Sequence, residues 1–187
     1  MAVLKRSLAA PLLLAAALLA APGAVRAQVA AEYDVKAAFL YNFTKFVEWP
    51  PSAFIDDGSS LKLCVLGEDP FGKSLQTVAG EEVAGRKLTV LAKGTLPDPA
   101  ICQILFISRS ERERLSEILS GVRGRPVLTV SDTKGFLDQG GIINFTLEGT
   151  KVRFEINQES AERSGLKISS KLLRLATRVV PGPRPGP

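Results

Sequence analysis

The 187-residue chain is long enough to bury one hydrophobic core without cross-links, which predicts a single domain. It has no histidine and no G-x-S-x-G motif, so hydrolytic sites built on Ser-His-Asp or Cys-His are excluded, and no metal site is expected. The net charge of +5 falls to +2 without the three basic residues of the N-terminal leader. That is too little for the basic patch that nucleic acid requires. We therefore expect neither an enzyme nor a nucleic-acid-binding protein.

Residues 1–27 are typical of a secretory signal peptide. Lys5 and Arg6 precede an apolar run over residues 8–21, and small residues lie at the −3 and −1 positions of a cleavage site after Ala27. We expect cleavage there and export of the chain. An uncleaved anchor is the weaker alternative, because the run is shorter than the roughly 18–20 residues that span a bilayer.

The spacing of apolar residues predicts a helix from Glu32 to Trp49, which ends before Pro50-Pro51. At 100° per residue, one arc of this helix contains Val35, Phe39, Asn42, Phe43 and Phe46. Lys36 is expected to lie away from the centre of the arc. Seven of the 12 aromatic residues of the chain lie between positions 33 and 54, so this helix should anchor the core.

Asn42 lies inside that apolar arc, where a buried amide must be hydrogen-bonded. A neighbouring loop is the simplest partner, and a bound ligand is the alternative. Asn42, Phe46 and Trp49 are therefore the candidate residues of a ligand pocket.

Strands and helices are expected to alternate through the middle of the chain. The predicted strands are Leu61–Gly67, Lys87–Ala92, Ile101–Ser108 and Pro126–Ser131. The predicted helices are Phe71–Ala79, Glu111–Leu119 with Ser110 as its N-cap, and a short helical turn near Thr133–Leu137.

The last third predicts a hairpin over Ile142–Asn157 around Glu148-Gly149-Thr150. A helical turn over Gln158–Ser164 follows, and then a closing helix over Ser170–Val179 with Leu175 on its buried side. The Pro- and Gly-rich residues 181–187 should be disordered. The fold class is thus a single-domain α/β sandwich over residues 28–180. We expect a mixed, mostly parallel sheet with helices on both faces and a C-terminal hairpin.

Residues 67–74, GEDPFGKS, match the P-loop pattern G-x-x-x-x-G-K-[ST]. Pro70 removes one of the backbone donors that such a loop directs at phosphate, and Glu68 and Asp69 would add negative charge beside an anion. An exported chain also meets few nucleoside triphosphates. We therefore interpret this stretch as a turn in which Asp69 caps a helix that Pro70 begins.

Cys64 and Cys102 are the two cysteines of a chain that we expect to be exported to a compartment where disulfides persist. An even number of cysteines favours one bridge, which would stabilise the fold by roughly 3–4 kcal/mol through the loop that it closes. Two buried free thiols are the alternative.

Four blocks of the sequence resemble the YfiR-type periplasmic proteins. They are AAFLYNFTKFVEWP at 37–50, VLGEDPFGKSL at 65–75, GGIINFTLEGTKVRFEIN at 140–157 and SGLKISSKLLRLA at 164–176. The blocks occur in the family's order and span about Asp34 to Val180, and GEDPFG belongs to the family's pattern.

The resemblance implies an α/β sandwich without a cofactor. It also implies a repressor that binds the periplasmic sensor domain of an inner-membrane diguanylate cyclase and lowers cyclic di-GMP. Members can be sequestered by an outer-membrane lipoprotein, and homodimers are common among them. Cys64 and Cys102 match the positions of a family disulfide. A second pair near the hairpin is missing here, so we expect a structural bridge rather than a redox switch.

Two functions follow as hypotheses. The first is a regulator that binds a partner, for which the candidate contact residues are Arg163, Leu166, Lys167, Ile168 and Leu172. An exposed apolar patch near Leu166 and Ile168 would favour it. The second is a periplasmic small-molecule or peptidoglycan-binding module without a cyclase partner, which an aromatic-lined cavity beside Asn42 and Trp49 would favour.

Overall fold

The computed structural model describes residues 22–56, 58–92 and 98–182, with side chains from residue 27 onward. The predicted leader falls mostly outside the described residues, and the predicted tail lies outside them from residue 183. No helix in the described part of the chain is both long and apolar enough to cross a membrane.

The described residues form a mixed eight-stranded sheet with the strand order β10-β8-β7-β6-β5-β2-β4-β3. The strands are β2 (Leu61–Leu66), β3 (Glu82–Val83), β4 (Arg86–Leu91), β5 (Ile104–Ile107), β6 (Leu128–Ser131), β7 (Ile143–Glu148), β8 (Lys151–Asn157) and β10 (Arg178–Val180). Strands β4, β2, β5, β6 and β7 are mutually parallel, whereas β3 runs antiparallel to β4, β8 runs antiparallel to β7, and β10 runs parallel to β8. The expected mixed, mostly parallel sheet is confirmed.

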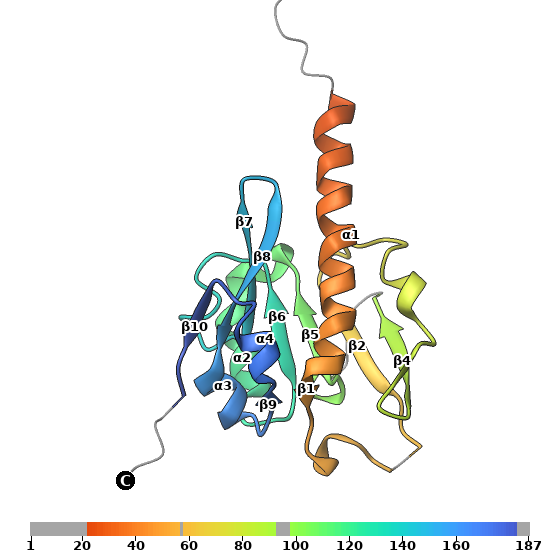
Figure 1. Ribbon diagram of the computed structural model, residues 1–187, viewed down its shortest axis with the longest axis vertical. Coiled ribbons are helices and arrows are strands. Elements are labelled where there is room, and N and C mark those ends of the chain that lie inside the picture. Colours follow the sequence, from red (N-terminus) through yellow and green to blue (C-terminus); the bar gives the residue numbers. More distant parts are fainter. Residues whose placement is uncertain (1–21, 57, 93–97, 183–187) are drawn as a thin grey trace, which may run out of the picture.

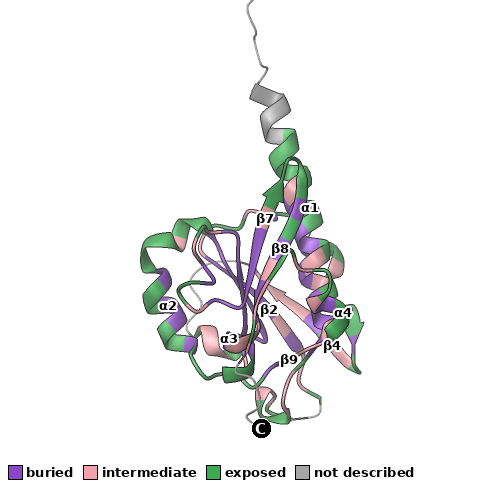
Figure 2. Cartoon of the chain, turned by 60° about the vertical axis from the view of Figure 1, so that its left-hand side comes forward, coloured by how far each residue is buried: buried purple, intermediate pink, exposed green. Residues whose placement is uncertain are grey.

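Helices cover both faces of this sheet, as Figures 1 and 2 show. Helix α1 (Pro22–Phe46) lies over one face, and α2 (Leu115–Val122) lies over the other. The buried apolar residues accordingly form two clusters, one under each helix. Strands β5 and β6 are buried along their whole length, as expected for parallel strands that are covered on both sides.

Short elements complete the chain. The 3₁₀ segments are Pro51–Ala53, Gln76–Val78, Pro99–Ile101 and Arg109–Arg114. The remaining elements are β1 (Val47–Glu48), α3 (Gln158–Arg163), β9 (Lys167–Ile168) and α4 (Ser170–Leu173). β1 pairs antiparallel with β9, so the residues that follow α1 are held against the C-terminal part of the chain.

A helix is confirmed at the predicted place, but α1 ends at Phe46 instead of Trp49, begins ten residues earlier than predicted, and buries a different face. Its buried residues are Tyr33, Lys36, Ala37, Leu40, Phe43 and Thr44, and Val47 of β1 continues the same face. At 100° per residue this face is centred about 120° around the axis from the predicted arc. Val35 and Asn42 are exposed, so the expected burial of the Asn42 amide is wrong.

The predicted hairpin is confirmed as β7–β8, with Glu148 paired to Lys151 across Gly149-Thr150. Gly149 adopts a φ of +60°, which suits a two-residue hairpin turn with glycine at its first central position.

The closing helix is wrong beyond its first turn. Only Ser170–Leu173 is helical, Leu175 is 63% exposed, and residues 178–180 form β10 beside β8. The backbone N–H of Thr177 donates to the carbonyl of Phe154 at 2.9 Å, and this bond helps to dock the chain at the free edge of β8. Pairing with the sheet therefore outweighs the local helix preference.

Three other predicted helical stretches differ from the structure, although the one over 111–119 is confirmed from Leu115 onward as the start of α2. Residues 71–79 form turns and a 3₁₀ segment, with the Asp69 side chain accepting from the N–H of Phe71, so no helix follows the P-loop-like stretch. Ser110 does not cap a helix over 111–119, because its hydroxyl accepts from the N–H of Glu68 and α2 begins only at Leu115. The stretch 133–137 is a turn rather than a helix.

Candidate functional site

A network of charged and polar side chains lies where β5 and β6 end beside α1. Asp132 follows β6 directly, and Arg109 lies two residues after the end of β5. Tyr33 and Lys36 come from the buried face of α1, one turn apart. Because β5 and β6 are parallel, their carboxyl ends meet at one edge of the sheet, which brings Arg109 and Asp132 together.

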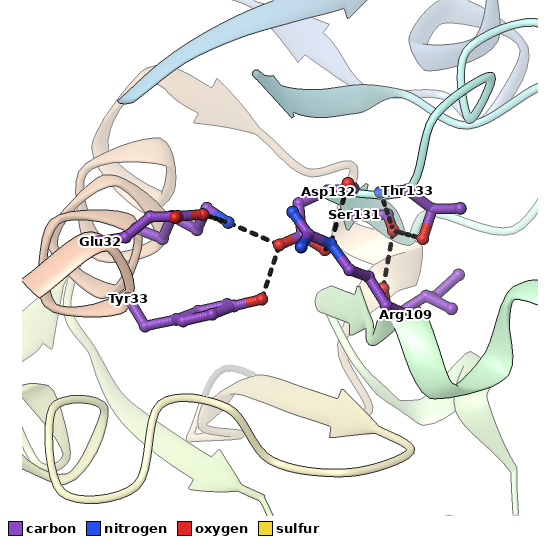
Figure 3. A network of polar contacts seen from close by, with 8 residues as sticks. Glu32, Tyr33, Arg109, Ser131, Asp132 and Thr133 are labelled. Carbon is purple, nitrogen blue, oxygen red and sulfur yellow. Dashed lines mark hydrogen bonds and ion pairs between the residues drawn. The ribbon is translucent and has the colours of Figure 1, made fainter. Parts of the chain in front are cut away.

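Asp132 is the centre of this network (Figure 3). Its Oδ2 lies 2.5 Å from Lys36 Nζ and accepts a hydrogen bond of 2.7 Å from the hydroxyl of Tyr33. Its Oδ1 lies 3.1 Å from Arg109 Nε, and Lys36 also forms an ion pair with Glu32. The side chains of Lys36 and Asp132 are 1% and 2% exposed, whereas Arg109 is 59% exposed.

Burial sets the electrostatics of the site. Two buried charges without partners would be unstable, so Lys36 and Asp132 must neutralise each other. Burial, followed by the hydrogen bond to Asp132 and the charge of that carboxylate, raises the pKa of Tyr33 well above its usual value. Tyr33 therefore remains a hydrogen-bond donor at neutral pH. Lys36 Nζ also lies 4.2 Å from the centre of the Tyr33 ring, where a cation is attracted to the aromatic face.

Neighbouring polar groups hold the turn after β6 in place. The hydroxyl of Ser131 donates to the carbonyl of Ile107 at 2.7 Å and accepts from the N–H of Thr133 at 3.1 Å. The amide of Asn144, with its nitrogen turned toward the turn, donates to the carbonyls of Ser131 and Thr133. The position of Asp132 is therefore fixed by β5, β6 and β7 together.

A pocket of about 480 Å³ opens over this network. Its charged lining residues are Glu32, Lys36, Arg109, Asp132, Lys134, Asp138, Glu155 and Arg178. Four are cations and four are carboxylates, so the pocket selects for neither sign of charge. The described residues contain no cluster of three or more His, Cys, Asp or Glu side chains placed to hold a metal ion.

A second, more apolar groove of about 510 Å³ lies between the N-terminal half of α1 and the β7–β8 hairpin. Val35, Phe39, Leu147 and Val152 form its apolar lining, and Glu32 and Leu147 line both hollows. The charged pocket and the apolar groove thus adjoin each other along the hairpin.

The candidate ligand residues from the sequence do not form a comparable site. Asn42 is exposed. Trp49 packs against the core and donates its Nε1–H to the carbonyl of Gln103 at 3.1 Å, and Phe46 is likewise half-buried against the core. These contacts give Phe46 and Trp49 a structural role.

The candidate partner residues lie in two settings. Leu166 and Leu172 are buried in the core, so Leu166 does not contribute to the exposed apolar patch that would have favoured a partner-binding regulator. Lys167 and Ile168 form β9, and Arg163 makes an ion pair with Glu159 on the surface of α3. Partner contact at these five positions remains a hypothesis, and only the exposed ones could be reached without rearrangement.

Cys64 and Cys102 form a disulfide, as expected. Both residues are buried in the cluster under α2, and the bridge joins β2 to the residue two positions before β5. The alternative of two free thiols is excluded.

Sequence reasoning missed the Asp132 network because Lys36 was placed outside the apolar arc. A detectable signal was present: Tyr33, Ala37, Leu40, Thr44 and Val47 recur at helical spacing with Lys36 among them. The position of Asp132 after a buried strand was a second signal, since carboxyl ends of parallel strands commonly carry binding residues.

The model of one protein family, described as YfiR/HmsC-like, matches residues 33–177. The match begins at Tyr33 in the Asp132 network and ends at Thr177, whose N–H is bonded to β8. It covers the sheet except β10, the disulfide and most of the residues that line the two hollows, and well over half of the chain. The chain therefore belongs to the YfiR/HmsC-like family.

Proposed function

We propose that this chain is a non-enzymatic periplasmic regulator that binds the periplasmic sensor domain of an inner-membrane diguanylate cyclase and lowers cyclic di-GMP. The observation that carries the proposal is the YfiR/HmsC-like match over residues 33–177. The buried Cys64–Cys102 disulfide supports an oxidising compartment, because such bridges persist in the periplasm and are rare in the cytosol.

The regulation would be a shift between two states of the cyclase. A regulator can shift that equilibrium only by binding the inactive state more tightly than the active one. Homodimerisation and sequestration by an outer-membrane lipoprotein are further parts of the proposal, and both would change the concentration of free regulator.

Cellular cyclic di-GMP tests this function. Deleting the gene should raise its level, and the full-length gene supplied in trans should lower it again. A version lacking residues 1–27 should fail to do so, and the same version fused to a foreign signal peptide should succeed. An unchanged level on deletion would rule out the repressor.

A small-molecule-binding module is the second candidate, and the 480 Å³ pocket over Asp132 favours it. The two functions separate in the same experiment. A binding module without a cyclase partner predicts that deletion leaves cyclic di-GMP unchanged.

A further inference from the structure

Strand β7 has a free edge over its second half. β8 pairs with all of β7 from Ile143 to Glu148. On the other side β6 pairs only with Ile143 and Asn144, because β6 ends at Ser131. In the part of the chain that the structure describes, no strand lies beside residues 145–148 on the β6 side.

The hydrogen-bond alternation of the hairpin shows which backbone groups face this edge. The N–H of Asn157 donates to the carbonyl of Ile142 at 2.8 Å, so this pair is hydrogen-bonded, and every second pair along the ladder is bonded in the same way. Thr146 and Glu148 therefore bond to β8, whereas the N–H and C=O of Leu147 point the other way. No described residue outside the hairpin forms a hydrogen bond with either group of Leu147.

The 480 Å³ pocket follows this edge. Lys36 and Phe145 line it from the α1 side of the sheet, while Asn144 and Glu155 line it from the other side. A pocket lined from both faces of a strand passes around the strand's edge. Thr146 and Leu147 line it as well, so their backbone borders the open space where β6 would continue.

The surroundings match the alternating side chains of an extended peptide. On the α1 side lies the apolar groove, where Val35 is 45% exposed and Leu147 is 48% exposed. Inside the pocket, Oδ1 of Asp132 lies 3.1 Å from Nε of Arg109, whose side chain is 59% exposed, so a polar side chain of the peptide would meet this ion pair from the solvent side.

We propose that an extended segment of the partner protein adds to the free edge of β7 at residues 145–147, in line with β6. Its backbone would bond to Leu147, one side chain would enter the apolar groove, and a polar side chain would meet the charged groups of the pocket around Arg109 and Asp132. Strand addition of this kind draws affinity from main-chain hydrogen bonds and specificity from alternate side-chain pockets. This inference rests on the proposed function, since the partner is the cyclase's periplasmic domain.

Proline at position 147 tests the edge directly. Leu147→Pro removes the outward N–H but no hydrogen bond to β8, so the hairpin can remain folded. Glu82→Pro is the matched control, because Glu82 is exposed on the edge strand β3 at the far end of the sheet and its N–H points away from β4. Leu147→Ala keeps the N–H and removes only the apolar side chain.

The binding probe is the purified periplasmic domain of the cyclase whose activity changes on gene deletion. We expect Leu147→Pro to weaken binding at least tenfold, Leu147→Ala to weaken it a few-fold, and Glu82→Pro to bind like the wild type. Circular dichroism and thermal melting would establish that all three variants fold. Amide hydrogen exchange of the wild type should show Leu147 protected in the complex and Glu82 unchanged.

The outcomes separate the two proposals. If the wild type binds the cyclase domain and folded Leu147→Pro binds equally well, the strand-addition site is wrong while the proposed function stands. An unprotected Leu147 amide in the complex would overturn the site in the same way. If the wild-type chain binds no cyclase domain, the proposed function fails, and the site that rests on it fails too.

Discussion

At the scale of single residues, Lys36 is the least expected member of the core. A lysine is rarely buried unless it is paired, and its carbon stem can pack among apolar groups while the charge reaches a partner. Lys36 reaches two carboxylates, Glu32 and Asp132, and lies over the Tyr33 ring. The charge at this position thus ties α1 to the end of β6.

Removing that charge should destabilise the protein strongly. In Lys36→Met the buried carboxylate of Asp132 loses its shortest ion pair, and breaking a buried pair typically costs about 3–5 kcal/mol of unfolding free energy. Urea denaturation would measure the loss. Arg153→Ala is the control, because it breaks the exposed pair with Glu148 and should cost under about 1 kcal/mol. Equal losses in the two variants would contradict a special role for the buried pair.

Tyr33 predicts a pH dependence on the alkaline side. Burial and Asp132 raise its pKa in the folded state above the value of about 10 that a tyrosine has in the unfolded chain. The unfolded state therefore loses its proton first, so this contribution to stability is full below pH 10 and declines as the pH rises above it.

The comparison of wild type with Tyr33→Phe isolates this effect. The difference in unfolding free energy between the two proteins should be constant from pH 7 to about pH 9 and should shrink above about pH 10. Parallel curves across that range would show that Tyr33 ionises alike in both states.

At the scale of elements, tertiary contacts determine where several segments pack, which their local sequence does not specify. Phe39 and Phe43 of α1 pack against Phe145 and Phe154 of the hairpin, with ring centres 5.3–6.1 Å apart. These aromatic contacts hold the hairpin against α1, and the open edge of β7 lies beside them. The hairpin is therefore held in place by its packing against α1.

The turn between β3 and β4 offers a stabilising change. Ala84 and Gly85 both have positive φ, +50° and +77°, between the paired residues Val83 and Arg86. A two-residue turn with both angles positive prefers Asn-Gly, and an alanine there is strained. Ala84→Asn should raise the unfolding free energy by about 0.5–1 kcal/mol in thermal or urea denaturation.

Gly85→Ala is the control for this turn, and it should act in the opposite direction by adding a strained alanine at the second position. No atom lies within 4 Å of the added Cβ, so any loss would reflect backbone strain alone. We expect a loss of about 1 kcal/mol. A stabilised Gly85→Ala variant would contradict the turn geometry.

At the scale of the whole molecule, two cores share one sheet, and the disulfide lies in the core under α2. It links positions 38 residues apart, from β2 to the approach of β5. These are adjacent parallel strands at the centre of the sheet. In the unfolded chain the bridge therefore keeps the residues of β2 close to those of β5, the two strands at the centre of the sheet.

Loss of the bridge should lower global stability. Replacing both Cys64 and Cys102 with alanine should cost about 3–4 kcal/mol by the loop-closure model. Urea denaturation of the double variant against the oxidised wild type would measure this loss. The wild type in reductant is the control, and it should approach the variant once the buried bridge is reduced. An unchanged urea midpoint in the double variant would mean that the native contacts alone hold β2 and β5 together.

Much of the fold could be predicted because its signals are local. The apolar runs of β2, β4, β5 and β6, the hairpin turn at Gly149 and the existence of the aromatic helix all follow from patterns within a few residues. The cysteine pair was predictable from its number and from the expected export. Partner contact and any bound ligand leave no such local pattern.

By itself the sequence determined the class of fold, the order of the central elements and the family, since periodicity and motif order survive without a structure. Only the tertiary structure decided which side of α1 is buried, because Lys36 becomes a core residue only when Asp132 meets it across 96 positions. It likewise turned the last predicted helix into β10, since the free edge of β8 offers backbone partners that no local pattern records. The open edge of β7 has the same origin: it exists because β6 ends at Ser131 while its neighbour continues to Glu148.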